Sequence, residues 1–193
     1  MKGYYTLRKT ILDILHSKLS DDLYYHGVHH TLDALKVSVF YLRHIKLNQH
    51  DSKLLRLGIL LHDIGFTETT EEHELKGAEI AKKLLSQHTF SAQDIQIITD
   101  LILVTKVPQR PKTIMEKIIC DVDLDYLGRS DFYTIGDQLY RELKVYTGLN
   151  NRNDWNKLQI KFLEAHRYHT EFAIKNRQPQ KEQHIKELKK MLR

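Results

Sequence analysis

The adjacent residues His62 and Asp63 are the first candidates for chemistry, because they end an otherwise apolar run, LLRLGILLHDIGF, from Leu54 to Phe66. A segment that is apolar on every side is typical of a buried helix. A carboxylate is rarely buried unless it is paired with a cation or coordinates a metal. The position of Asp63 therefore predicts a compensating positive charge close to it.

His73 is a further ionisable side chain that helical spacing turns toward the interior. It shares one stripe of a predicted helix with Gly77, Ile80 and Ala81, since residues three or four positions apart lie on the same helix face. Gly77 leaves space one turn away from the imidazole. The alternative is a histidine that only packs in the core.

The segment IICDVDLDYLG carries three acids at alternate positions. In a helix, Asp123 shares its face with Ile119 and Tyr126, whereas Asp121 and Asp125 lie beside each other on a different face. We therefore expect Asp123 to be the inward acid of the three. In a strand all three would share one face, so this prediction depends on the helix.

The segment YYHGVHHTLDAL places three histidines within five positions around a glycine, at a predicted helix start. His26 and His30 are four residues apart and can share a face, but spacing does not choose between His29 and His30 as a metal ligand. A turn with polar caps is the alternative. We expect the remaining histidines at polar ends or faces to be exposed or to cap helices: His16, His44, His50, His88 and His184.

The inward or crowded groups together form a plausible metal-binding set. They comprise one histidine of this segment, the pair His62 and Asp63, His73, and Asp123. Two neutral imidazoles and two carboxylates suit a divalent transition metal such as Mn, Fe, Co or Zn. Mg or Ca is less favoured, because these ions prefer oxygen ligands. The single cysteine excludes an internal disulfide and a zinc site built on paired cysteines.

The elements that must position these groups are predicted to be helices. The chain of 193 residues has only three prolines and eight glycines, and its apolar residues recur at three- and four-residue spacing. We predict one all-α domain over residues 1–193. Its expected helices cover about residues 4–19, 29–47, 51–64, 70–88, 92–105, 114–127, 131–147 and 153–176, followed by a helical tail. Capping boxes are predicted at Thr69 with Glu72, Ser91 with Asp94, and Thr113 with Glu116.

Composition limits the partners of this domain. The formal charge is +5, but much of the excess lies in the tail, where Ile185, Leu188 and Leu192 recur at helical spacing and predict a helix packed on its own domain. Nucleic-acid binding is therefore not favoured. No segment is long and apolar enough to span a bilayer, and the N-terminus lacks a signal-peptide core, so we expect a cytoplasmic protein. A homo-oligomer is compatible with the sequence.

The order of histidine, His-Asp pair and aspartate resembles that of the HD-domain metal-dependent phosphohydrolases. The resemblance covers about residues 20–130 and rests on four segments in order: YHGVHHTLDAL, LGILLHDIGF, EEHELKGAEIAKKLL and CDVDLDYLG. It implies an all-helical bundle with a central metal held by His30, His62, Asp63 and Asp123. Helices in residues 131–193 lie outside the common motif. The GYP signature of the cyclic-di-GMP branch is absent.

The resemblance also implies an activity, the hydrolysis of a nucleotide or other phosphate mono- or diester by a metal-activated water. Asp63 would orient that water, and His26 matches the general acid of cyclic-nucleotide phosphodiesterases in the same superfamily. We expect substrate contacts from His73, Lys106, Arg110 and Arg129. Relatives with two or three metals have a histidine where this chain has Thr105, so we expect one ion.

Two other functions compete with hydrolysis. A non-catalytic module could bind a nucleotide and regulate a partner, but such a module has no need to retain four candidate ligands. A di-iron oxygenase needs additional histidine ligands, and Thr105 argues against it.

Overall fold

The computed structural model describes residues 2–192, and every regular element within that range is helical. Ten α-helices are α1 (Lys2–Lys18), α2 (Val28–His44), α3 (Gln49–Leu61), α4 (His73–Leu85), α5 (Ala92–Leu103), α6 (Ile114–Asp123), α7 (Phe132–Thr147), α8 (Arg152–Ala165), α9 (Glu171–Asn176) and α10 (Gln178–Met191). Two short 3₁₀ helices are η1 (Ile64–Thr67) and η2 (Asp125–Gly128). The all-α prediction is confirmed. None of the helices in this range is both long and apolar enough to cross a membrane.

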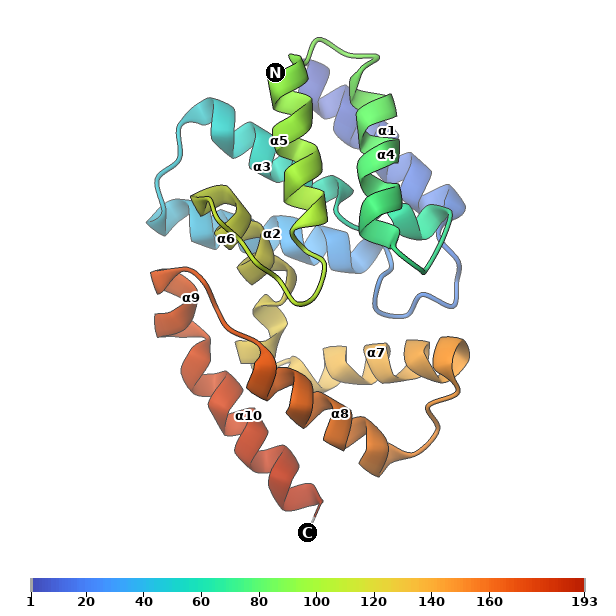
Figure 1. The fold of residues 1–193 in the computed structure, drawn as a ribbon, viewed down its shortest axis with the longest axis vertical. Helices are drawn as coiled ribbons and strands as arrows, with labels where there is room; N and C mark the ends of the chain where they lie inside the picture. Colours follow the sequence, from blue (N-terminus) through green and yellow to red (C-terminus); the bar gives the residue numbers. More distant parts are fainter. Residues whose placement is uncertain (1, 193) are drawn as a thin grey trace.

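Helix α3 is buried because it has an apolar face in each of two cores. Leu55 and Ile59 belong to the core that α3 shares with α2, α6 and the C-terminal helices. Leu57 and Leu61 belong to the core that it shares with α1, α4 and α5. All four side chains are fully buried. In Figure 1, α7 to α10 lie below the layer formed by the first six helices. The apolar run therefore reflects a central helix, as predicted.

Two of the three predicted capping boxes are present, at Ser91 and at Thr113. The third is wrong, because α4 begins only at His73, after Glu72 in a left-handed conformation (φ 51°). The helix starts later than predicted because the backbone at Gly65 lies directly against the backbone at His73. A capping pattern in the sequence does not reveal such a contact. A Cβ atom at Gly65 would overlap the carbonyl oxygen of His73, so the chain enters α4 while packed directly on η1.

The single helix expected over residues 153–176 is instead two helices, α8 and α9. The break between them explains why Asp121, which was not expected to point inward, is buried. Residues 166–170 separate α8 from α9, and their backbone amides need other acceptors. Asp121 accepts the backbone N–H groups of His169 and Thr170, both at 2.8 Å, and the Thr170 hydroxyl. Asp121 is therefore fully buried, although Asp123 was expected to be the one inward acid.

Asp125 is also buried, in η2, where the helix expected to reach residue 127 has already ended. Its Oδ1 atom accepts hydrogen bonds from the Tyr41 hydroxyl and from Nε of Arg177, both at 2.8 Å. The helical register separated Asp123, which faces the histidines, from Asp121, but the expectation that Asp123 alone points inward is wrong. The register could not show that the C-terminal helices would cover the opposite face.

The tail packs on its own domain, as predicted. Leu188 is buried against the core, and Ile185 and Leu192 pack partly buried beside it. His184 was expected at an exposed position and is 2% exposed. Its ring stacks on Phe132 at 4.3 Å, because α10 lies on η2 and the start of α7.

Candidate metal centre

The four predicted ligands come together from three separate parts of the chain. His30 lies in the first turn of α2, His62 and Asp63 follow α3, and Asp123 is the last residue of α6. Nε2 of His30 lies 3.1 Å from Nε2 of His62 and 3.1 Å from Oδ1 of Asp123. Oδ2 of Asp63 lies 3.2 Å from Nε2 of His62 and 3.5 Å from Nε2 of His30. The structure therefore brings together the set expected from the sequence, with His30 and not His29 in the cluster.

The end of α3 determines which nitrogen His62 presents to the cluster. Nδ1 of His62 donates a hydrogen bond to the carbonyl oxygen of Ile59 at 2.8 Å. A carbonyl oxygen can only accept, so Nδ1 carries the proton and the neutral ring presents the lone pair of Nε2. That lone pair faces His30 and the carboxylate of Asp63.

The cluster consists of acceptor atoms that need a positive charge between them. His62 and Asp63 are buried, and Oδ2 of Asp63 has no hydrogen-bond partner among the residues that the structure describes. Ligand atoms bound to one cation at about 2.0–2.1 Å lie roughly 3.0–3.4 Å apart. The observed separations of 3.1–3.5 Å match this spacing. The four residues therefore fit a divalent metal with nitrogen and oxygen ligands.

The pKa shifts of the clustered side chains also indicate that the two carboxylates are stabilised by positive charge. Burial raises the pKa of Asp123, but hydrogen bonds and charges from His30 and His62 outweigh it and hold the pKa at about 2. Burial also opposes ionisation of Asp63, but the charge of His62 holds its pKa well below the ordinary value. Both carboxylates are ionised at neutral pH. Burial lowers the pKa of His62, but Asp63 and Asp123 outweigh it and raise the pKa well above the ordinary value, so that without a metal Nε2 also holds a proton. A metal bound to Nε2 would take the place of that proton, and the ring would then be neutral with its proton on Nδ1.

His26 is held beside the cluster by a residue that the sequence did not indicate. Nδ1 of His26 lies 2.5 Å from Oε1 of Glu142, which is buried in α7. Oε2 of Glu142 accepts the backbone N–H groups of Tyr25 at 2.8 Å and His26 at 3.0 Å. Burial lowers the pKa of His26, but the hydrogen bond to Glu142 outweighs it and raises the pKa. Glu142 lies more than a hundred positions away in the chain, and no local pattern marks it.

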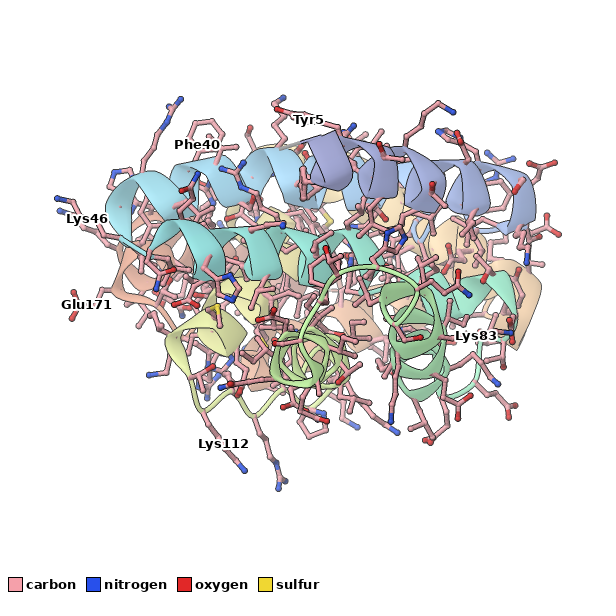
Figure 2. All side chains as sticks on the ribbon, turned by 90° about the horizontal axis from the view of Figure 1, so that it is seen from above. Tyr5, Phe40, Lys46, Lys83, Lys112 and Glu171 are labelled. Carbon is pink, nitrogen blue, oxygen red and sulfur yellow. The ribbon has the colours of Figure 1, made fainter. Side chains whose placement is uncertain are left out.

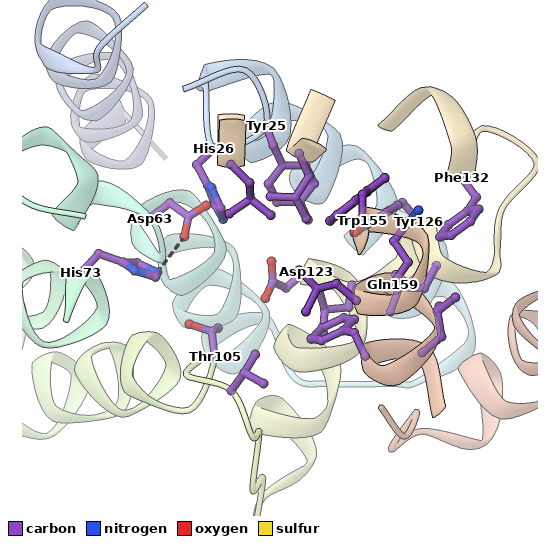
Figure 3. Close-up of a pocket in the computed structure, with 18 of the residues that line it drawn as sticks. Tyr25, His26, Asp63, His73, Thr105, Asp123, Tyr126, Phe132, Trp155 and Gln159 are labelled. Atoms are coloured by element: carbon purple, nitrogen blue, oxygen red, sulfur yellow. Dashed lines mark ion pairs between the residues drawn. The ribbon is translucent and has the colours of Figure 1, made fainter. Parts of the chain in front are cut away.

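Phe66 is the second functional residue that the sequence did not reveal. Its ring stacks with those of two histidines, with the centroid 4.3 Å from that of His26 and 4.0 Å from that of His73. Nε2 of His73 lies 3.6 Å from Oδ1 of Asp63, on the side away from the cluster. Figure 3 marks this ion pair and shows His26, His73 and Asp63 at one end of a pocket. Phe66 therefore packs against both of the histidines that flank Asp63.

Two of the basic side chains expected to bind substrate, Lys106 and Arg110, do not face the pocket at the candidate metal centre. Lys106 is half exposed and forms an ion pair with Glu72 at 2.5 Å, and Arg110 is exposed. Neither lines the pocket that contains Asp63. Lys112, at the end of the same loop, projects outward in Figure 2.

Arg129 is closer to the centre and borders a neighbouring cavity together with His30 and Asp123. Its guanidinium is already held by Asp33 at 2.7 Å and Asp131 at 2.6 Å. Its charge is therefore largely neutralised by carboxylates of its own chain.

Thr105 lies near the position where the family resemblance led us to look for a further histidine ligand. It lines the pocket, and its hydroxyl donates to the carbonyl oxygen of Ile102 at 2.7 Å. The described residues that cluster as metal ligands include His30, His62 and Asp123, whose donor atoms lie within 4.8 Å of one another. Thr105 adds no ligand to this set.

Comparison with known families gives a match over residues 27–124, to the family described as HD domain. The matched segment contains all four clustered ligands and ends just after Asp123. No curated protein and no solved structure matches the chain. The match covers half of the chain and agrees with the helical fold and the His-Asp cluster. The chain therefore belongs to the HD-domain family, whose superfamily comprises metal-dependent phosphohydrolases.

Proposed function

We propose that this protein hydrolyses a phosphate ester, either a nucleotide or another mono- or diester. One divalent transition-metal ion would be held by His30, His62, Asp63 and Asp123. The observation that carries the proposal is the largely buried cluster of His30, His62 and Asp123, with the carboxylate of Asp63 beside both imidazoles, at the end of a pocket. When bound, such an ion lowers the pKa of water and neutralises phosphoryl oxygens.

The side chains around the cluster support defined roles in this reaction. Oδ2 of Asp63 has no hydrogen-bond partner, so it can accept a proton or a hydrogen bond from the attacking water. Because Nδ1 of His26 is held by Glu142, its other ring nitrogen is available to donate a proton to the leaving oxygen. Of the four expected substrate contacts, His73 is the one that lines the pocket.

The test begins with metal content, measured by elemental mass spectrometry on protein purified without a metal-binding tag. We expect about one equivalent of Mn, Fe, Co or Zn, lost in Asp63→Ala and in Asp123→Ala. The control is Asp13→Ala, because Asp13 is exposed on α1, where it pairs with Lys9. The wild type should then hydrolyse phosphate esters with that metal, and Asp63→Ala should not.

Other results would exclude this function in favour of a specific alternative. Two equivalents of iron with oxygen-consuming turnover would indicate the di-iron oxygenase. Nucleotide binding without any turnover would indicate a regulatory module.

A further inference from the structure

The pocket that begins at the metal centre continues into an apolar chamber. It has a volume of about 300 Å³, and its polar end is formed by His26, Asp63 and His73. Its far end is formed largely by α7 and α8, which lie outside the family match (Figure 3). The side chains that characterise this end are Phe132, Leu139, Leu143, Trp155, Leu158 and Phe162. A group bonded to a phosphate at the metal centre would extend into this chamber.

The chamber offers almost nothing to a charged or strongly polar group. No lysine or arginine is among the described residues that line it. Away from the imidazoles and carboxylates of the metal end, the polar side chains that line it are all neutral: Tyr25, Thr105, Tyr126, Trp155 and Gln159. The Thr105 hydroxyl already donates to the carbonyl oxygen of Ile102. Among the described residues, the Tyr25 hydroxyl and Nε1 of Trp155 are buried without a hydrogen-bond partner. A charged group placed here would lose hydration without a compensating charge, and a sugar would find few partners for its hydroxyls.

The apolar walls are also not filled by the protein's own side chains. Leu158 is 44% exposed, and Leu139, Leu143 and Phe162 are only partly buried. Large apolar side chains left open around a concavity are typical of a ligand site, because a ligand that covers them removes apolar surface from water. The continuity of this surface with the catalytic end identifies the occupant as part of the substrate.

We infer that the substrate is a phosphate ester whose organic part is a compact apolar alkyl or aryl group, seated between α7 and α8. The inference rests on the proposed function and narrows it, since it disfavours a nucleotide. A single acceptor atom on that group would find the N–H of Trp155.

The test uses methyl-, butyl- and octylphosphonate, which are not hydrolysed, in the presence of manganese. The chain's single tryptophan, Trp155, lines the chamber, so its fluorescence reports binding without turnover. We expect the dissociation constant to fall by about threefold to fourfold for each methylene buried. Leu158→Ser should weaken octylphosphonate binding by about tenfold and leave methylphosphonate binding unchanged. The control is Val145→Ser, because Val145 is exposed on α7 but does not line the chamber.

Hydrolysis of octyl phosphate and of adenosine 5′-monophosphate is then compared with the same metal. A higher kcat/KM for octyl phosphate would support the inference. Equal binding of all three phosphonates, or a higher kcat/KM for the nucleotide, would overturn the inference and leave the proposed hydrolysis intact. Hydrolysis of neither ester, nor of any other in the screen, would overturn the proposed function, and with it the assignment of the chamber to a substrate.

Discussion

Replacing Glu142 by glutamine tests whether this residue positions and charges His26. The carboxylate of Glu142 holds the His26 ring at 2.5 Å and two backbone N–H groups at 2.8 and 3.0 Å. Glutamine has nearly the same shape, but its amide has one acceptor oxygen and donates from the other end. One of these charge-assisted contacts must therefore be lost. A hydrogen bond to a charged group contributes about 1.5–3 kcal/mol, so we expect Glu142→Gln to lower the free energy of unfolding by about 2 kcal/mol.

The stability difference should depend on pH in a defined direction. Glu142 raises the pKa of His26 above its ordinary value, so the stabilisation is fully present below the unfolded pKa of histidine and is lost as pH rises through the folded pKa. The pKa of Glu142 is in turn lowered, chiefly by His26 against the effect of burial, so its contribution disappears in acid. The difference between wild type and Glu142→Gln should be largest between these limits, near pH 5–6.

Catalysis gives the second readout. Because the hydrogen bond and charge of Glu142 raise the pKa of His26, the substitution should lower that pKa. If His26 is the general acid, kcat should fall by about 100-fold, and the alkaline limb of the pH profile should move to lower pH. The assays are urea unfolding at several pH values, metal analysis, and kcat against pH with an active ester. A normal metal content with an unchanged pH profile would refute the role given to Glu142.

Three further substitutions test the geometry around the site. Gly65→Ala should lower the free energy of unfolding by about 2–4 kcal/mol and reduce metal content, because the new Cβ would overlap the His73 carbonyl oxygen. Wild-type stability in urea would contradict this close packing. Phe66→Leu removes two ring stacks, each contributing about 0.5–1.5 kcal/mol, and should lower kcat more than metal affinity. A variant with wild-type kcat would show that the stacking does not position the histidines. Asp121→Ala leaves buried amides before α9 unpaired, including that of Thr170. It should lower the free energy of unfolding, measured by heat or urea, by about 2–3 kcal/mol without loss of metal. A change in the free energy of unfolding of less than about 0.5 kcal/mol would refute this role of Asp121.

The local part of this protein could be predicted from its sequence. Helical periodicity and the caps at Ser91 and Thr113 depend on residues within one or two turns of each other, so they are readable from spacing. The apolar run that ends at Asp63 indicated both a central helix and a need for compensating charge. Spacing alone left His29 and His30 open as ligands, and the family resemblance chose His30, the one that lies in the cluster.

Only the tertiary structure decided what surrounds that centre. Glu142 reaches His26 across 116 positions of the chain, and no periodic pattern extends over such a separation. Asp121 and Asp125 are buried because the C-terminal helices cover a face that the register of α6 assigned to solvent. The apolar chamber exists because α7 and α8 place their leucines opposite the metal ligands. Spacing within a helix defines its faces, but the packing of distant helices determines which faces meet, and therefore what this site can bind.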